Sequence, residues 1–547
     1  MSSETPNSDN IPDAGELTAT LGKIAEQSQR MVTEFMARQT DQASSDSNSD
    51  PLNIGDAFVQ MTQRMLADPA RMAEAQVGLW NSYLELWQQT ADKMMGKEVE
   101  PLATPEADDR RFKDADWQEN PVFDYIKQSY LMTSKWMINT VRETDGLDDE
   151  TARKVDFYTR QFVDAMAPTN FAVSNPEVLR ETVDSKGQNL INGLSNLLND
   201  LEQGDGQLKI KHVENDAFVI GETVATSPGK VVFQNELFQL LQFSPLTKKV
   251  RKTPLLIVPP WINKYYILDL SEQNSMVRFL VAQGYTVFMV SWKNPDASDR
   301  DLSMEDYRAL GVMAAIDAAL AITSAPKLHA VGYCLGGTLL SIAAAAMGRD
   351  GDARLASVTM MAAQVDFTRA GQLRLFINDS EVTLIEDMMA EKGYLSSDQM
   401  AGAFAMLRAR DLIWAPAIRN YLLGERSAPF DLMAWNADGT RMPARMHSEY
   451  LRKLILNNDL AEGRYHVGDK SIAVADIAVP IFAVGTEDDH VAPWQSVYKL
   501  HILADTDVTF VLTSGGHNAG IVSEPGHAGR HYRIGETPAL AAYQDPD

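Results

Sequence analysis

The sequence predicts an α/β protein. A doubly wound, mostly parallel sheet carries a helical cap insertion and follows an all-helical N-terminal domain. Two observations support this prediction. From about residue 207 onward, short apolar runs with β-branched residues alternate with helical stretches, which is the pattern of a parallel sheet covered by helices. Before about residue 205, apolar residues recur at helical spacing instead.

The composition limits the class of protein. The chain has 547 residues, of which 45% are hydrophobic and 23% charged, so it can build the cores of roughly two to four globular domains. Its net charge of −26 argues against nucleic acid and anionic membranes as partners. A single cysteine, Cys334, excludes an internal disulfide and a Cys-based zinc site. We predict no metal site.

The helical N-terminal domain is predicted over residues 1–205. Residues 1–14 and 39–50 are polar enough that we expect disorder there, whereas residues 16–37 have the apolar spacing of an amphipathic helix. The N-terminus has neither a basic region nor an apolar stretch after it, so we expect no secretory signal. No stretch reaches the roughly 18 apolar residues of a transmembrane helix.

The second domain is predicted over residues 206–547. Six short apolar runs predict its buried strands, at 255–258, 286–291, 328–331, 356–361, 481–484 and 508–512. The interval between the fourth and fifth runs is too long for one crossover connection. It is mostly helical in pattern, so we expect a cap insertion at about 365–475.

Cys334 lies in the segment Gly332-Tyr333-Cys334-Leu335-Gly336-Gly337, between a predicted strand and a small-residue helix. This is the pattern of a nucleophile elbow, with sulfur in place of the usual oxygen. The positive end of the following helix favours a thiolate and a developing oxyanion. A buried structural cysteine is the alternative reading of the pentapeptide alone.

Two later strands supply partners for this nucleophile. Asp489 follows the fifth predicted strand and His517 follows the sixth, and the order nucleophile, acid, histidine is that of hydrolase-type sheets. Because strand ends of this kind gather at one edge of the sheet, we expect a triad. Asp488 or Glu487 could replace Asp489, whereas His490 precedes the last strand and is interpreted as a packing residue.

The residue types imply roles. His517 would take the proton of Cys334, and Asp489 would hold the imidazole tautomer. The amide of Leu335 would supply one oxyanion donor, and the second would come from the loop at 259–263, where we assign Ile262. A thioester on cysteine stays activated, whereas an oxyester on serine does not, so the sulfur favours acyl transfer over hydrolysis if water is excluded.

An ordered series of motifs now identifies a resemblance. The motifs are PTNF at 168–171, NPEVL at 175–179, PPWINKYYILDL at 259–270, SWKNP at 291–295, GYCLGGT at 332–338, WNADGTRMP at 435–443, DH at 489–490 and GGH at 515–517. Over roughly residues 165–530 the chain resembles the class I polyhydroxyalkanoate (poly-3-hydroxybutyrate) synthases of the α/β-hydrolase superfamily. Residues 1–110 match only loosely. The family usually continues further past the catalytic histidine than this sequence does after His517.

The resemblance implies a fold and a reaction. The fold is α/β-hydrolase-like. The substrate is an (R)-3-hydroxyacyl-CoA, chiefly 3-hydroxybutyryl-CoA. CoA leaves as a product rather than serving as a cofactor, and the polyester grows from an acyl group on Cys334. His517 corresponds to the general base of the family. Asp489 corresponds to its catalytic aspartate, which has also been assigned to activating the 3-hydroxyl, so that its role stays open.

Partners and location follow from the same resemblance. We expect a homodimer at the surface of polyester granules in the cytoplasm, together with granule-associated proteins. Four residues near the predicted strand ends are candidates for binding the substrate and its CoA, namely Asn263, Lys293, Asn294 and Arg369. The basic run at 248–252 could attract the CoA phosphates, but a solvated loop before a strand is the preferred interpretation.

Two other classes of function remain open. A thioesterase or esterase on the same scaffold would release free hydroxy acid and no polymer. A granule-coat protein without activity would rest on the acidic, Met-rich N-terminal region. Product analysis separates the first from a polymerase, and labelling of Cys334 together with turnover separates the second.

Overall fold

The computed structural model describes residues 54–106, 109–204, 208–210, 218–426, 430–539 and 541–542. The disorder predicted for 1–14 and 39–50 and the helix predicted for 16–37 lie outside these residues. The chain forms two compact units. One consists of Met1–His212 with Arg408–Ala428, and the other of Val213–Leu407 with Pro429–Asp547. The predicted domain boundaries stay predictions.

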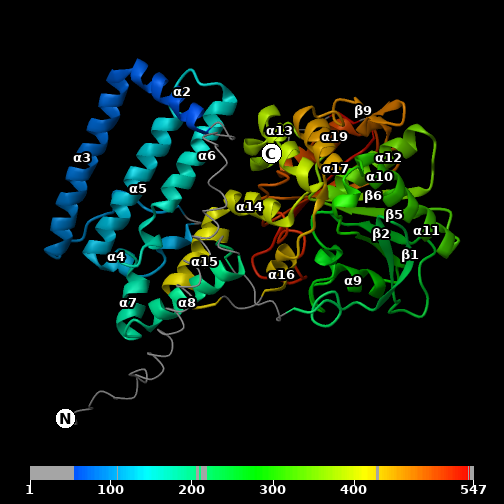
Figure 1. The fold of residues 1–547 in the computed structure, drawn as a ribbon, viewed down its shortest axis with the longest axis horizontal. Helices are drawn as coiled ribbons and strands as arrows, with labels where there is room; N and C mark the ends of the chain where they lie inside the picture. Colours follow the sequence, from blue (N-terminus) through cyan, green and yellow to red (C-terminus); the bar gives the residue numbers. More distant parts are fainter. Residues whose placement is uncertain are drawn as a thin grey trace, which may run out of the picture. The chain divides into compact units, whose positions relative to one another are not determined.

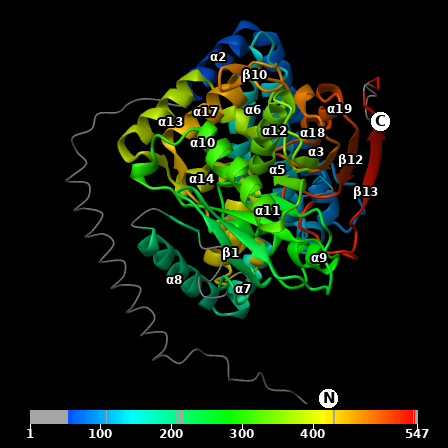
Figure 2. The same cartoon turned by 90° about the vertical axis from the view of Figure 1, so that its right-hand side faces the viewer.

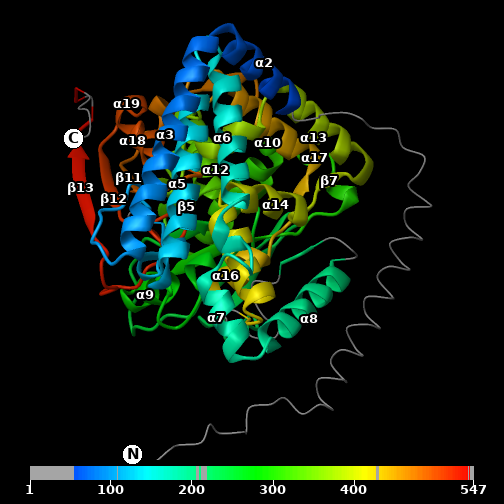
Figure 3. The ribbon, with the colours of Figure 1, turned by 90° about the vertical axis from the view of Figure 1, so that its left-hand side faces the viewer.

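The first unit is helical, as the sequence predicts. Asparagine or aspartate N-caps followed by proline begin three of its helices, at Asn120, Asn175 and Asp68, because the cap satisfies a free amide and proline needs none. Three long helices, α3 (Pro69–Met94), α5 (Pro121–Arg142) and α6 (Asp149–Ala165), pack side by side (Figure 3). The helices are α2 (Ile54–Ala67), α3 (Pro69–Met94), α4 (Asp116–Glu119), α5 (Pro121–Arg142), α6 (Asp149–Ala165), α7 (Pro176–Asp184) and α8 (Gln188–Gln203).

A segment from far along the chain completes this unit. We call Arg408–Ala428 the strap; it contains η7 (Arg410–Trp414), α15 (Ala415–Ala417) and η8 (Ile418–Leu422), and it packs on α8 (Figure 1). Arg426 bonds the buried carboxylate of Asp200 at 2.8 Å, and Arg410 bonds Asp164 at 2.7 Å. Part of the predicted cap insertion therefore belongs to the helical unit, which no pattern in the sequence indicates.

The second unit contains a nine-stranded sheet within the described residues, in the order β1-β2-β4-β3-β5-β6-β11-β12-β13. All six predicted strands are present and form its parallel centre, namely β3 (Leu255–Val258), β4 (Val287–Trp292), β5 (Leu328–Tyr333), β6 (Leu355–Met361), β11 (Ile481–Thr486) and β12 (Val508–Thr513). Three antiparallel strands flank it, namely β1 (Gly229–Gln234), β2 (Phe238–Phe243) and β13 (Tyr532–Thr537). Figure 2 shows β13 as the outermost strand beside β12.

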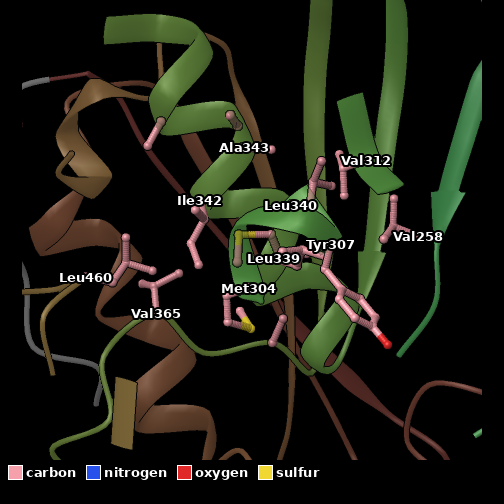
Figure 4. Packing of buried hydrophobic residues seen from close by; sticks show 14 of the residues in the cluster. Val258, Met304, Tyr307, Val312, Leu339, Leu340, Ile342, Ala343, Val365 and Leu460 are labelled. Carbon is pink, nitrogen blue, oxygen red and sulfur yellow. The ribbon is translucent and has the colours of Figure 1, made fainter. Parts of the chain in front are cut away.

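Helices cover both faces of the sheet (Figure 1). One face is covered by α10 (Met304–Asp306), η5 (Tyr307–Met313), α11 (Ala314–Thr323), α12 (Leu335–Arg349), α18 (Trp494–Tyr498) and α19 (Leu500–Leu503), and the other by η3 (Tyr265–Leu268) and α9 (Met276–Ala282). In Figure 4, Leu339 and Leu340 of α12 lie near Val258 of β3 and Tyr307 of η5. This buried cluster anchors the helix that begins just after Cys334.

The insertion between β6 and β11 is mostly helical. Outside the strap it contains η6 (Gly371–Phe376), α13 (Asp379–Lys392), β7 (Tyr394–Leu395), α14 (Ser397–Leu407), α16 (Asp431–Ala437), β8 (Met442–Pro443), α17 (Ala444–Glu449), η9 (Tyr450–Leu456), β9 (Tyr465–Val467), β10 (Lys470–Ile472) and η10 (Val474–Asp476). Among the described residues, no helix is both long enough and apolar enough to cross a bilayer.

Candidate active site

Cys334 occupies a sharp turn between β5 and α12. Its backbone has φ 50° and ψ −126°, a conformation that L-residues adopt only where the surrounding structure enforces it. The enforcing contacts are backbone hydrogen bonds. The amide of Cys334 donates to Met361 O at 2.9 Å, and its carbonyl accepts from Gly337 N at 2.9 Å and Thr338 N at 3.2 Å. The turn therefore presents the sulfur at the carboxyl edge of the sheet, as the sequence predicts for an elbow.

Glycines allow this turn because backbones approach closely on both sides of it. A Cβ on Gly336 would overlap the backbone of Val258 and Pro259, and one on Gly332 would overlap Gly337. The same contacts bring the first turn of α12 against the loop that follows β3. The geometry explains why the elbow needs glycine two residues before and after the nucleophile.

Replacing Gly336 by alanine is expected to destabilise the second unit by about 1–3 kcal/mol. The added Cβ would press against backbone atoms, and no side-chain rotation can relieve this overpacking. The matched control is Gly402→Ala in α14, where an added Cβ meets nothing within 4 Å and alanine should stabilise the helix by about 0.5–1 kcal/mol. Thermal unfolding of both variants checks this. Equal melting temperatures for the two variants would contradict the packing argument.

His517 and Asp489 lie beside the sulfur. His517 Nε2 is 3.2 Å from Cys334 Sγ, and His517 Nδ1 is 2.7 Å from Asp489 Oδ2. The other carboxylate oxygen of Asp489 accepts from the amides of Val491 and Ala492, both at 2.8 Å. The structure thus brings the three predicted triad residues together in one hydrogen-bonded line from the loops after β5, β11 and β12.

The surroundings of Asp489 and His517 shift the pKa values of both side chains. Burial raises the pKa of Asp489. The charge and hydrogen bond of His517, together with the two amides, lower this pKa by more than burial raises it, so that it lies below its ordinary value. Burial lowers the pKa of His517, yet the charges of Asp489 and Cys334 outweigh burial and hold that pKa well above its ordinary value. The site therefore favours the protonated form of His517 and the ionised form of Asp489.

The acidic residues beside Asp489 have other partners. Glu487 pairs with His531 Nε2 at 3.1 Å, and the amide of Asp488 donates to Gly515 O at 3.0 Å. The carbonyl of His490 accepts from Gln372 N at 3.1 Å. Of the acidic residues considered, Asp489 is the one hydrogen-bonded to His517.

The predicted oxyanion donors lie on the two segments that meet at Gly336. Leu335 is the first residue of α12, where helix geometry leaves the amide without an intrahelical acceptor. Ile262 lies in the loop after β3, and its carbonyl accepts from Thr440 N at 2.9 Å. The loop is held further by Trp435, whose indole donates to Lys264 O at 2.7 Å. The α16 segment therefore fixes the loop that carries Ile262.

The four candidates for substrate binding lie in different environments. The side chain of Asn263 donates to Trp435 O at 3.3 Å, and that of Asn294 accepts from Arg441 N at 3.0 Å, so both connect loops to the insertion. Lys293 forms an ion pair with Asp299 at 2.8 Å. Arg369 is exposed, and its carbonyl accepts from Ser496 Oγ at 2.9 Å. The hydrogen bonds and ion pair above link none of the four to the triad.

Sequence reasoning missed Tyr450, which begins η9 in the insertion. It is buried, and burial together with the charge of Cys334 raises its pKa above the ordinary value. Nothing in its local sequence signals this, because η9 follows the nucleophile by more than a hundred residues. Among the described residues, no group of three or more His, Cys, Asp or Glu side chains could hold a metal ion.

The fold defines an α/β-hydrolase-fold protein with a cysteine at the turn between β5 and α12. Residues 253–523 match the family model of the alpha/beta hydrolase fold, and residues 108–280 match that of the poly-beta-hydroxybutyrate polymerase (PhaC) N-terminus. These two matches cover both the elbow and the end of the helical unit.

Relatives extend the likeness over most of the chain. A poly(3-hydroxyalkanoate) polymerase of Methylorubrum extorquens is 44% identical over 89% of this chain and 81% of its own length. The poly(3-hydroxyalkanoate) polymerase subunit PhaC of Rhizobium meliloti is 40% identical over 96% and 87%, and that of Cupriavidus necator is 38% identical over 84% and 77%. The chain belongs to the poly(3-hydroxyalkanoate) polymerase family and is an acyltransferase.

Proposed function

We propose that the protein polymerises (R)-3-hydroxyacyl-CoA, chiefly 3-hydroxybutyryl-CoA, into a polyester and releases CoA, through a thioester on Cys334. The observation that carries the proposal is the 3.2 Å approach of His517 Nε2 to Cys334 Sγ in a chain of this family. CoA is part of the substrate and a product, so the proposal needs no cofactor.

The first half-reaction forms the acyl-enzyme. His517 Nε2 takes the thiol proton, and the sulfur of Cys334 attacks the thioester carbonyl. The amides of Leu335 and Ile262 would donate to the oxyanion, and losing one such donor typically lowers the rate by ~10²–10³-fold. When the intermediate collapses, the bond between the carbonyl carbon and the CoA sulfur breaks, and His517 returns the proton to the leaving thiolate.

The second half-reaction extends the polymer. The hydroxyl of a hydroxyacyl unit gives its proton to His517 and attacks the acyl carbon on Cys334. A carbon–oxygen ester bond forms, the carbon–sulfur bond breaks, and the thiolate is regenerated. Because a thioester is exchanged for an oxyester, this step is downhill, whereas transfer from a serine ester would be nearly balanced.

Asp489 is better suited to orient His517 than to activate the 3-hydroxyl. Both of its oxygens accept hydrogen bonds from protein groups, and its side chain is fully buried. A base that abstracts a substrate proton must lie within hydrogen-bond reach of that proton. We therefore assign the imidazole of His517 to both proton transfers.

The setting of the reaction is also proposed. Family membership supports a homodimer that works at the surface of a polyester granule in the cytoplasm, with granule-associated proteins as neighbours. Sedimentation of the protein without and with its polymer product would test the homodimer and its attachment to the polyester.

Mass spectrometry after brief exposure to 3-hydroxybutyryl-CoA tests the central step. We expect one hydroxyacyl mass on Cys334, followed by polymer and stoichiometric free CoA. Free 3-hydroxybutyrate without polymer would identify a thioesterase instead. An acyl adduct on another residue would overturn the proposed route.

A further inference from the structure

Tyr333 immediately precedes the nucleophile and is completely buried at the end of β5. Its hydroxyl donates to Asn518 Oδ1 at 2.5 Å and lies 3.4 Å from the carbonyl of His517. Its ring also packs on the imidazole of His517, with the ring centroids 6.0 Å apart. One side chain thus touches both the proposed base and the residue after it.

Several contacts hold the loop that carries His517. It leaves β12 after Thr513, and the described segment up to β13 contains no helix or strand. Gly515 accepts from the amide of Asp488 at 3.0 Å, and Thr513 Oγ1 donates to Gly520 O at 2.8 Å. These bonds fix the start of the loop relative to β11 and β12. The hydrogen bond from Tyr333 fixes it relative to β5, the strand that leads into Cys334.

We propose that Tyr333 is a positioning residue for the acyl transfer. Its hydroxyl, bonded to Asn518, holds the loop after β12 so that His517 Nε2 stays within hydrogen-bond distance of Cys334 Sγ. The inference rests on the proposed function for its catalytic meaning. The path between the two reacting side chains is short. Tyr333 precedes Cys334 in the chain and bonds directly to Asn518, which follows His517.

The neighbouring groups suit this role. Burial and the charges of Cys334 and Asp489 hold the pKa of Tyr333 well above its ordinary value, so the phenol remains a donor at neutral pH. Asn518 presents its oxygen to Tyr333, and its amide nitrogen donates to Asn436 Oδ1 of α16 at 3.5 Å. These two partners together define the orientation of the Asn518 amide. The carbonyl of Asn518 also accepts from Val522 N at 2.9 Å, which ties the turn that follows.

The test removes one oxygen with Tyr333→Phe and measures two properties. The first is the steady-state rate of CoA release. The second is the pH dependence of iodoacetamide alkylation, which reports on Cys334 alone because the chain has one cysteine. We expect kcat to fall about tenfold with KM changed less than about twofold, because removing a buried hydrogen bond alters the spacing of a proton transfer. We also expect the alkylation profile to move to higher pH.

Two further variants make the test specific. Asn518→Ala should reproduce both effects, and the double variant should be no worse than the more affected single variant, because both substitutions break the same bond. The matched control is Tyr83→Phe, whose hydroxyl lies 2.6 Å from Thr133 Oγ1 in the helical unit. It should leave kcat and the alkylation profile unchanged.

A lower melting temperature with an unmoved alkylation profile would show that Tyr333 is only structural, and would overturn the inference. If Tyr333→Phe does not fold, Asn518→Ala decides alone, and an unchanged profile there rejects the inference. Alkylation needs no acyl-CoA. A failure of the proposed reaction in the unsubstituted protein is therefore distinguishable from a failure of the positioning role.

Discussion

Cys334→Ala is expected to lower CoA release from 3-hydroxybutyryl-CoA by at least ~10⁴-fold, because without the sulfur no covalent intermediate forms. Polymer should be undetectable, and brief exposure to substrate should leave no acyl mass on the protein. The backbone bonds of the elbow involve the amide and carbonyl of residue 334, so the variant should still fold. Circular dichroism and thermal unfolding verify this point. Polymer formation at more than a hundredth of the original rate would refute the route through Cys334.

Cys334→Ser serves as the companion variant for the argument about sulfur. A hydroxyl in the same place can form only an oxyester, from which transfer to the next hydroxyl gains little. We expect slow acylation and accumulation of an adduct that resists neutral hydroxylamine, whereas the adduct of the unsubstituted protein is cleaved. Rapid polymerisation by the serine variant would remove the energetic reason for a cysteine elbow.

Asp489→Asn is expected to lower kcat by ~10⁴-fold through the wrong histidine tautomer. The amides of Val491 and Ala492 both donate to Oδ1, so they select the oxygen of an asparagine at that position. The NH₂ group then faces His517 Nδ1 and donates to it. The ring proton consequently moves to Nε2, which can no longer accept the proton of Cys334.

Single-turnover CoA release between pH 6 and 9 measures this effect. Asp488→Asn is the matched control, because it removes the neighbouring carboxylate and leaves the bond between Asp489 and His517 in place. The two variants should differ by about the full ~10⁴-fold. Comparable losses in both variants would mean that general negative charge, rather than the orientation of the imidazole, supports the reaction.

The same pair makes stability depend on pH. The raised pKa of His517 contributes stability that is present below its ordinary value of 6.5 and is lost as the pH rises through the folded-state value. The lowered pKa of Asp489 contributes stability above 3.8 that is lost as the pH falls through its folded-state value. Asp489→Asn should therefore flatten the stability profile on the alkaline side of pH 6.5.

Burial explains which strands could be predicted from the sequence. The six central strands are continuous apolar runs because helices cover both of their faces. The edge strands β1 and β13 face solvent, with Tyr532 68% and Ile534 60% exposed, and their mixed polar sequences resemble loops. The spatial proximity of the triad could be predicted because Cys334, Asp489 and His517 each follow a strand of the same parallel sheet.

Other site features depend on contacts that no local pattern encodes. Lys293 follows a strand end, as expected, but its ammonium group pairs with Asp299. The ion pair with a residue six positions along the chain, rather than the position of Lys293 at the strand end, sets the orientation of the Lys293 side chain. Tyr450 is buried by the packing of the insertion, and Asn518 meets the hydroxyl of Tyr333 only in the folded chain.

The strap has a consequence for how this protein can be divided. The chain passes between its two units three times, after His212, Leu407 and Ala428, so no single cut separates them cleanly. A fragment that begins at residue 213 would retain Arg410 and Arg426 but would lack Asp164 and Asp200, their acidic partners. A chimera that borrows the helical unit of a relative must therefore borrow the strap as well, because the two pieces form one compact unit despite their distance along the chain.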